Sequence, residues 1–331
     1  MKRFLDLGDL SREEVLSLLE LARRLERQPE PHALTGKILG LLFFNPSLRT
    51  LASCQAAMAR LGGSSLVIHP GQGSWQLETR SGVVMDGAAA EHVREGLPVL
   101  AAYCDALGIR VFAEGRELEA DLADTHFNVM AALIDKPLIN LESAINHPCQ
   151  ALADWKTLDD LAVPRAGRFV LSWVWHPRPL PLAVPAAALH MAALRGMEVI
   201  VVRPEGFALP AAVMERARRA AAASGGSVRE SSERAEALEG AQVLYAKEWG
   251  ATACYGDPAG DARLRSGQRD WCVRNEWFAR APECRVMHCL PVRRNSAIAD
   301  EVLDSPRSVV QREAWNRLPA QMAVLHQLLK S

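Results

Sequence analysis

Short apolar runs alternate along the chain with longer segments in which apolar residues recur at helical spacing. The first such pair is an apolar run at residues 38–44 and an Ala-rich segment at residues 51–61, which Gly62 and Gly63 close. The run predicts a buried parallel strand, and the segment after it predicts a helix that ends at glycine. Because the alternation continues along the chain, we expect an α/β fold with helices on both faces of parallel sheets.

The same alternation predicts the remaining strands and helices. Strands are expected at residues 38–44, 64–69, 106–112, 137–140, 169–175, 198–202, 227–231, 242–246 and 286–289. Helices are expected at residues 12–27, 51–61, 91–104, 118–132, 151–161, 186–194, 210–224, 233–239 and 311–330. Ser11 and Glu14 predict a capping box before the first helix, and Pro319 should kink the last helix or end its first part.

Composition narrows the class of protein. The 331 residues suffice for two domains, and 49% apolar with 23% charged residues is typical of a globular protein. A net charge of −1 without a basic block argues against nucleic acid as a partner, and no apolar run is long enough for a membrane span. The early Asp6 argues against a signal peptide, and seven scattered cysteines predict reduced thiols, so we expect a cytoplasmic protein.

The junction after the strand at residues 38–44 carries Ser47, Leu48, Arg49 and Thr50. The first N–H groups of a helix have no intrahelical partner and the helix dipole is positive there, so such a terminus suits phosphate. Arg49 can add two parallel hydrogen bonds to phosphate oxygens. The alternative is an ordinary N-cap, since Ser and Thr are common caps.

Other polar clusters also follow predicted strands. They are Arg110, residues 142–150, residues 176–178, Lys247 and residues 289–293. Because ligands of open α/β sheets bind beyond the carboxyl ends of the strands, this shared placement predicts a binding site.

The clusters predict two kinds of chemistry. Beside a phosphate held by arginines, His147 and Thr50 could donate to a carbonyl oxygen on which charge develops, and Gln150 could contact an amide. Cations in the second half suit carboxylates: Lys247, Arg293 and Arg178. The plainer alternatives are that His147 is a packing residue, that these cations are solvated surface charges, and that Cys289 is a packed thiol rather than a nucleophile.

Neither a metal nor a nucleotide cofactor is expected. The nine histidines are dispersed, and no carboxylate pair has the spacing of metal ligands. The loop at residues 71–76 contains G-x-G but lacks the third glycine of a dinucleotide fingerprint, which argues against a nucleotide-binding oxidoreductase.

Three motifs resemble those of the aspartate and ornithine carbamoyltransferases. Residues 47–50 are similar to the carbamoyl-phosphate motif of that family, residues 147–150 to its H-P-x-Q motif, and residues 288–291 to the H-C-L-P motif of the ornithine branch. The N-acetylornithine and N-succinylornithine enzymes resemble the chain further, at Trp75, residues 84–87, residues 176–181, residues 245–247 and residues 293–295. The D-x-x-x-S-M-G segment with which ornithine enzymes read a free α-amino group is absent from the sequence, as expected for an acylated substrate.

The resemblance implies two doubly wound α/β domains. Residues 1–146 would bind carbamoyl phosphate, residues 147–310 would bind the acylornithine, and the helix at residues 311–330 would pack back on the first domain. The chain would pass through the proline-rich loop at residues 177–185 and so form a deep trefoil knot in the second domain. The resemblance also implies a homotrimer with shared active sites, in which Trp75 reaches the site of a neighbouring subunit.

The resemblance further implies roles for individual residues. Arg49, Thr50, Arg110 and His147 would be catalytic. The residues that would hold carbamoyl phosphate are Ser47, Leu48, Arg49, Thr50, Trp75, Arg110, His147, Pro148, Cys149, Gln150, Cys289, Leu290 and Arg317. Those that would hold the acylated ornithine are Glu142, His176, Arg178, Lys247, Leu290 and Arg293.

Two departures from the family pattern bear on activity. Leu51 stands where the family has a second arginine, which is not the main phosphate ligand. Ala90 stands where acetylornithine enzymes have a glutamate and succinylornithine enzymes a proline, and Ala297 where the former have a modified lysine. Without that glutamate, a second carboxylate on the substrate meets no local repulsion.

The expected reaction is therefore transfer of a carbamoyl group from carbamoyl phosphate to the δ-amine of N-succinyl-L-ornithine, within arginine biosynthesis. N-acetyl-L-ornithine is the alternative acceptor. A non-catalytic ligand-binding homologue is a more remote alternative, which Leu51 and Ala90 motivate.

Overall fold

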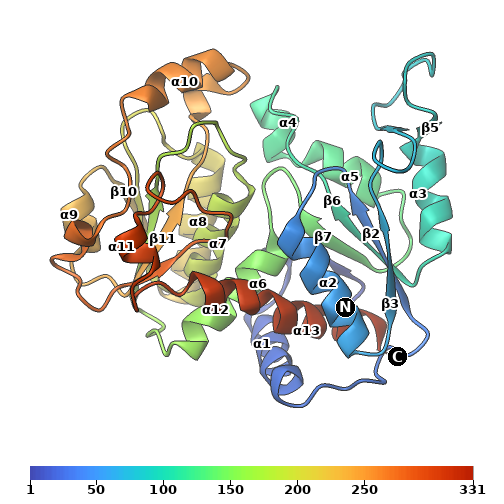
Figure 1. Ribbon diagram of the computed structural model, residues 1–331, viewed down its shortest axis with the longest axis horizontal. Coiled ribbons are helices and arrows are strands. Elements are labelled where there is room, and N and C mark those ends of the chain that lie inside the picture. The colour runs from blue at the N-terminus through green and yellow to red at the C-terminus, as the bar shows by residue number, and fades with distance from the viewer. Residues whose placement is uncertain (331) are drawn as a thin grey trace. The chain divides into compact units, whose positions relative to one another are not determined.

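The computed structural model describes residues 1–330, which divide into two compact units (Figure 1). The first unit comprises Met1–Glu114, Glu119–Leu152 and residues 317–330, and the second comprises Gly115–Leu118 and Ala153–Asn316. Each unit contains one five-stranded parallel sheet, so the predicted α/β class is confirmed.

The sheet of the first unit has the strand order β1-β7-β6-β2-β3. These strands are β1 (Arg3–Phe4), β7 (Leu138–Glu142), β6 (Ala106–Arg110), β2 (Ile38–Phe43) and β3 (Ser64–Ile68). The central strands β2, β6 and β7 end close together because neighbouring parallel strands share one direction. A separate two-stranded ribbon pairs β4 (Leu77–Glu78) with β5 (Glu91–His92).

The helices of the first unit form two groups. A short 3-10 helix η1 (Leu7–Asp9) precedes α1 (Arg12–Arg27), which packs with α13 (Arg317–Leu329), and α13 packs with α2 (Leu48–Arg60). The other group is α3 (Val93–Ala102), α4 (Leu118–Leu122) and α5 (Thr125–Ala131). Side chains of α3 and α5 such as Leu97 and Phe127 share a buried core with Leu42 and Ile109 of the sheet.

The sheet of the second unit has the order β10-β9-β8-β11-β12. Its strands are β10 (Ser227–Ser231), β9 (Glu198–Val202), β8 (Arg168–Trp173), β11 (Val243–Lys247) and β12 (Arg285–Met287). The helices are α7 (Ala183–Arg195), α8 (Ala211–Ser224), α9 (Arg234–Leu238), α10 (Pro258–Ser266), α11 (Asp300–Leu303) and α12 (Val310–Trp315), with 3-10 turns η2 (Thr252–Cys254) and η3 (Asn275–Phe278). Helix α6 (Pro148–Asp160) begins in the first unit and ends in the second.

Most predicted elements are present, and the capping box of Ser11 and Glu14 is confirmed. Helices α2 and α6 begin three residues earlier than predicted, at Leu48 and Pro148. The single helix predicted at residues 118–132 is wrong, because Asp124 has a left-handed φ of 52° that separates α4 from α5.

The last predicted helix is interrupted, but at Asn316 rather than at the proline. Pro319 lies in the first turn of α13, where a missing N–H is tolerated. Several elements were not predicted, namely β1, β4, the three 3-10 helices, α10 and α11. Strand β5 was wrongly predicted as the start of the helix at residues 91–104.

Two further properties of the described residues bear on the class of protein. All seven cysteines are free thiols. Over residues 1–330, no helix has the length and apolar character that crossing a membrane requires.

Candidate functional site

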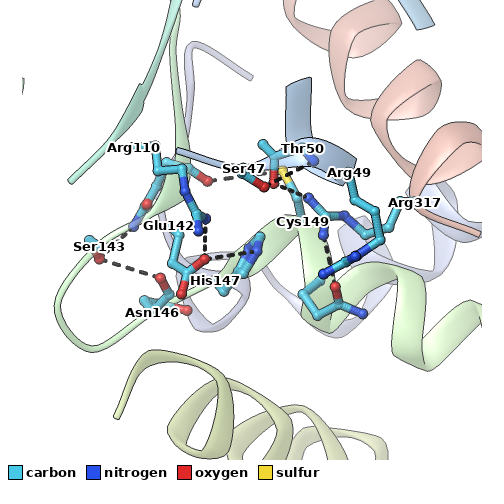
Figure 2. A network of polar contacts seen from close by, with 12 residues as sticks. Ser47, Arg49, Thr50, Arg110, Glu142, Ser143, Asn146, His147, Cys149 and Arg317 are labelled. Atoms are coloured by element: carbon cyan, nitrogen blue, oxygen red, sulfur yellow. Dashed lines mark hydrogen bonds and ion pairs between the residues drawn. The ribbon is translucent and has the colours of Figure 1, made fainter. Parts of the chain in front are cut away.

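Three strand ends of the first unit bring the predicted anion-binding residues together (Figure 2). The turn after β2 carries Ser47, Arg49 and Thr50, β6 ends at Arg110, and the segment after β7 carries His147. Arg49 is half-buried, and its charge acts on His147 together with that of Arg110. The structure therefore brings together the residues that the sequence placed at these strand ends.

The start of α2 is both a capped helix end and part of this site. Ser47 is in an extended conformation, and its hydroxyl accepts the Thr50 N–H at 3.2 Å. The N-cap alternative is thus correct for Ser47, but a cap satisfies only part of the donors of a helix terminus. The Thr50 side chain faces the site and is buried, whereas Leu48 is 79% exposed.

Arg110, Glu142 and His147 form a buried contact network. Arg110 Nη1 pairs with Glu142 Oε2, and His147 Nε2 lies 3.4 Å from the same oxygen. Burial, followed by the charges of Arg317, Arg110 and Arg49, holds the pKa of His147 well below its ordinary value. His147 is therefore a neutral imidazole, and its Nδ1 has no hydrogen-bond partner among the described residues.

Arg317, at the start of α13, completes the site from the far end of the sequence. Its Nη1 donates to Gln150 Oε1 at 2.8 Å, and its Nη2 donates to Thr50 Oγ1 at 2.9 Å. The side chain is only 3% exposed, and its Nε has no hydrogen-bond partner within residues 1–330.

We call Arg49, Arg110, Arg317, Glu142 and His147 the arginine cluster. The cluster combines three guanidinium groups, one carboxylate and one neutral imidazole, and therefore has a net charge of +2. Of the three arginines, Arg110 pairs with Glu142, whereas Arg49 and Arg317 lie on the other side of His147 (Figure 2). Arg110 and Arg317 are buried and Arg49 is half-buried, and an excess of positive charge removed from water in this way is unfavourable unless an anion compensates it. The arrangement therefore suits a dianionic ligand such as a phosphate group.

Other residues predicted for this ligand have different surroundings. Cys149 is buried, and burial raises the pKa of its thiol to about 11, so it contributes packing rather than charge. Trp75 is 61% exposed, and its indole N–H donates to Glu91 Oε2 at 2.8 Å. Ala90 is exposed beside β5, and Leu51 is half-buried in the first turn of α2.

The second unit carries its own polar group at the ends of β8 and β11. Arg293 Nε donates to His176 Nε2 at 2.9 Å, and His176 Nδ1 lies 2.8 Å from the carbonyl oxygen of Arg178. Burial is the main reason why the pKa of His176 is lowered, so its ring is neutral. Because Nε2 accepts from Arg293, the proton of the neutral ring lies on Nδ1, which faces the Arg178 carbonyl oxygen. The Arg178 N–H, 3.1 Å from the same nitrogen, then finds no acceptor there.

Lys247 belongs to a second buried chain of contacts. Its Nζ lies 3.4 Å from Glu248 Oε2, which also accepts from His288 Nε2 at 3.2 Å, and His288 Nδ1 accepts the Leu290 N–H at 2.9 Å. Burial alone would raise the pKa of Glu248, but Lys247 and His288 outweigh it and hold that pKa below its ordinary value. The sequence reading gave Glu248 no role.

Cys289 is a packed thiol, as the plainer alternative expected. It is buried, and burial raises its pKa to about 12, so the thiolate needed for nucleophilic attack is not formed near neutral pH.

The loop of residues 71–76 is not a dinucleotide fingerprint. It joins β3 to the ribbon strand β4, whereas a fingerprint leads directly into a helix. Within the described chain, no group of three or more His, Cys, Asp or Glu side chains is arranged to hold a metal ion.

Comparisons with known proteins agree with this geometry. The model of the aspartate/ornithine carbamoyltransferase carbamoyl-P binding domain matches residues 2–160, and that of the Asp/Orn binding domain matches residues 184–328. An N-acetylornithine carbamoyltransferase of Xanthomonas campestris pv. campestris is 37% identical over 99% of this chain and 98% of its own length. An N-succinylornithine carbamoyltransferase of Bacteroides thetaiotaomicron is 35% identical over 100% of this chain and 99% of its own.

A solved structure is similar over the same extent. It is an N-acetyl-L-ornithine transcarbamylase with a glutamate-to-alanine substitution, complexed with carbamyl phosphate and N-succinyl-L-norvaline. Its TM-score is 0.95 at 36% identity, over 99% of this chain and 100% of the solved chain.

Proposed function

Because the chain belongs to the aspartate/ornithine carbamoyltransferase family and is therefore a carbamoyltransferase, we propose that it carbamoylates the δ-amine of N-succinyl-L-ornithine. The donor is carbamoyl phosphate, and the products are N-succinyl-L-citrulline and phosphate, in a step of arginine biosynthesis. N-acetyl-L-ornithine is the second candidate acceptor, because relatives with either name match nearly the whole chain.

The observation that carries the donor half of this proposal is the charge of the arginine cluster. A dianionic phosphate compensates a net charge of +2, and guanidinium groups bind phosphate through paired hydrogen bonds. The neutral His147 then has one ring nitrogen available for the uncharged carbamoyl group beside the phosphate.

Arg317 orients the other two groups proposed to hold the carbamoyl moiety. The Thr50 hydroxyl accepts from Arg317, so its own proton is available for the carbamoyl oxygen. Gln150 accepts from Arg317 through its carbonyl oxygen, which fixes the orientation of its amide. Donors fixed in this way stabilise the charge that develops on the oxygen as the amine attacks.

In the proposed reaction, the lone pair of the δ-nitrogen forms a C–N bond to the carbamoyl carbon. The C–O bond to phosphate breaks, and the electron pair leaves with the phosphate. A free amine has a pKa of about 10.4, so the reacting amine is the minor neutral form. After attack, the departing phosphate accepts the ammonium proton, and positioning with charge stabilisation supplies most of the rate.

The acceptor half of the proposal rests on the second unit. Lys247 and Arg293 are cations suited to the carboxylates of an acylated ornithine, with His176 and Arg178 beside Arg293. Glu142 and the backbone at Leu290 are further proposed contacts. A succinyl group has one carboxylate more than an acetyl group, which favours a site rich in cations.

Ala90 supports the succinyl acceptor. The resemblance places a glutamate here in acetylornithine enzymes, and alanine removes that negative charge. Solved relatives in which a glutamate is replaced by alanine, proline, serine or valine are complexed with N-succinyl-L-norvaline, which agrees with this reasoning. Close like charges cost several kcal/mol, so the side chain at this position can decide which acyl group is accepted.

The assembly is also a proposal. Trp75 and Leu48 are exposed, as expected of residues that meet another copy of the chain in a homotrimer with shared sites. We further propose the donor domain at residues 1–146 with the helix at residues 311–330, the acceptor domain at residues 147–310, and a trefoil knot at the loop of residues 177–185.

Product identification tests the function directly. The chain is mixed with carbamoyl phosphate and N-succinyl-L-ornithine, N-acetyl-L-ornithine or L-ornithine, and products are identified by mass spectrometry. N-succinyl-L-citrulline should form fastest, Arg49→Met should abolish it, and Arg60→Met at the exposed end of the same helix should not. A strong preference for the acetyl acceptor would overturn the succinyl assignment, and no phosphate release with any ornithine would overturn catalysis itself.

A further inference from the structure

Helix α10 (Pro258–Ser266) carries a buried arginine that the proposed function does not use. Arg265 is 2% exposed, although helix α10 is otherwise largely solvent-facing. Its Nε donates to Asp261 Oδ1 at 2.6 Å, one turn earlier in the helix. Its terminal nitrogens donate to two backbone carbonyls, Nη1 to His176 at 3.2 Å and Nη2 to Trp249 at 3.3 Å.

The surroundings of Arg265 hold it in one position. Asp261 is itself buried, and its second oxygen accepts the Ala251 N–H at 2.7 Å. The Arg265 guanidinium also lies 5.7 Å from the ring centre of Trp173 and 5.4 Å from that of Phe207. A buried ion pair stabilises a defined geometry when its remaining donors and acceptors are satisfied, and here most of them are.

The two carbonyls belong to the segments that carry the proposed acceptor contacts. His176 follows β8, and Trp249 follows Lys247 at the end of β11. The His176 ring in turn accepts from Arg293 and donates to the Arg178 carbonyl. One guanidinium therefore joins two strand ends, and through His176 it fixes the direction of a third proposed contact, Arg293.

We infer that Arg265, held by Asp261, is a positioning residue that orients His176, Arg293 and the Lys247 segment for the acylated ornithine. This inference rests on the proposed function for its ligand. It assigns Arg265 no contact with substrate. The three contacts of Arg265 require a planar guanidinium group that donates in three directions, and the ammonium group of lysine cannot replace it.

The test compares Arg265→Lys with Arg263→Lys, an exposed arginine of the same helix, in the full-length chain. KM for the acylornithine should rise about 10- to 100-fold in Arg265→Lys, as expected when binding groups are displaced by a remote change. Carbamoyl phosphate affinity, measured by calorimetry, should stay within about twofold of wild type, because the arginine cluster lies in the first unit. Arg263→Lys should change neither quantity.

A second readout does not depend on turnover. In protein labelled with ¹⁵N-histidine, the His176 resonances, assigned with His176→Asn, should show a proton on Nδ1 in wild type and a changed tautomer ratio in Arg265→Lys. If wild type transfers no carbamoyl group to any ornithine, the proposed function fails, and the spectrum alone then decides the positioning role. Unchanged His176 resonances, or a KM shift equal to that of Arg263→Lys, would overturn the inference.

Discussion

Replacing Arg317 by methionine tests the charge argument for the donor site. Arg317 already gives its two terminal nitrogens to Thr50 and Gln150, while its Nε has no partner within residues 1–330. A bound phosphate would accept one further charge-assisted hydrogen bond from this Nε. Methionine keeps much of the volume but removes the charge and all donors.

The expected loss of phosphate affinity follows from that one hydrogen bond. A hydrogen bond to a charged group contributes about 1.5 to 3 kcal/mol, which corresponds to a loss of phosphate affinity of about 10- to 100-fold. At a phosphate concentration 100 times the wild-type Kd, binding stabilises the folded chain by about 2.7 kcal/mol. At the same concentration, the variant would gain only about 0.4 to 1.4 kcal/mol.

Thermal unfolding with and without inorganic phosphate measures this difference. Each kcal/mol shifts Tm by about 2 to 4 °C in a folding unit of this size, so wild type should gain about 5 to 10 °C. Arg317→Met should gain about half of that or less. Arg312→Met is the control, because Arg312 is partly exposed and pairs with Asp160 in the second unit. The charge argument is refuted if phosphate raises Tm of Arg317→Met as much as that of wild type.

Three further outcomes are expected. Because the pKa of His147 is lowered in the folded state, only the unfolded chain takes up this proton below about pH 6.5, and the free energy of unfolding decreases as the pH decreases. His147→Gln should weaken this dependence by up to about 1.4 kcal/mol per pH unit, measured by urea unfolding at pH 5.5 and pH 7. Cys289→Ala should keep kcat within about threefold, because a buried thiol with a pKa of about 12 is no nucleophile, and a loss of activity near 10⁴-fold in a progress-curve assay would contradict this. Ala90→Glu should lower kcat/KM for the succinyl acceptor by about 10- to 100-fold and leave that for the acetyl acceptor nearly unchanged; equal losses in a competition assay would show that charge at this position does not select the acyl group.

Apolar runs were sufficient to predict the strands of both sheets, because a short segment that is apolar on both faces has few other secondary structures open to it. The strands β2, β9 and β10 lie within one or two residues of their predicted bounds. Helix starts were less predictable. At Leu48 and Pro148 the helix begins within a polar segment, where the preceding strand end and not periodicity decides the conformation.

The pattern of apolar and polar residues could not predict short elements or contacts between residues far apart in the sequence. Helix α10 has few apolar positions because its buried face is formed by Asp261 and Arg265, an ion pair that looks like surface charge in the sequence. The contact between Arg317 and Thr50 spans 267 residues. Only a resemblance to known enzymes could suggest it, because no local rule relates a helix start to a residue so far away.

The neutrality of His147 follows from the same charges that suit the site to phosphate. Arg317, Arg110 and Arg49 each disfavour a proton on the imidazole, and burial disfavours it most. A protonated His147 would raise the cluster charge to +3 and hold a dianionic product more tightly, which slows its release. It would also be a strong acid beside an amine that must stay neutral to attack. In the proposed reaction, three arginines around one histidine would therefore bind the leaving group and, for the same electrostatic reason, keep the proton away from the nucleophile.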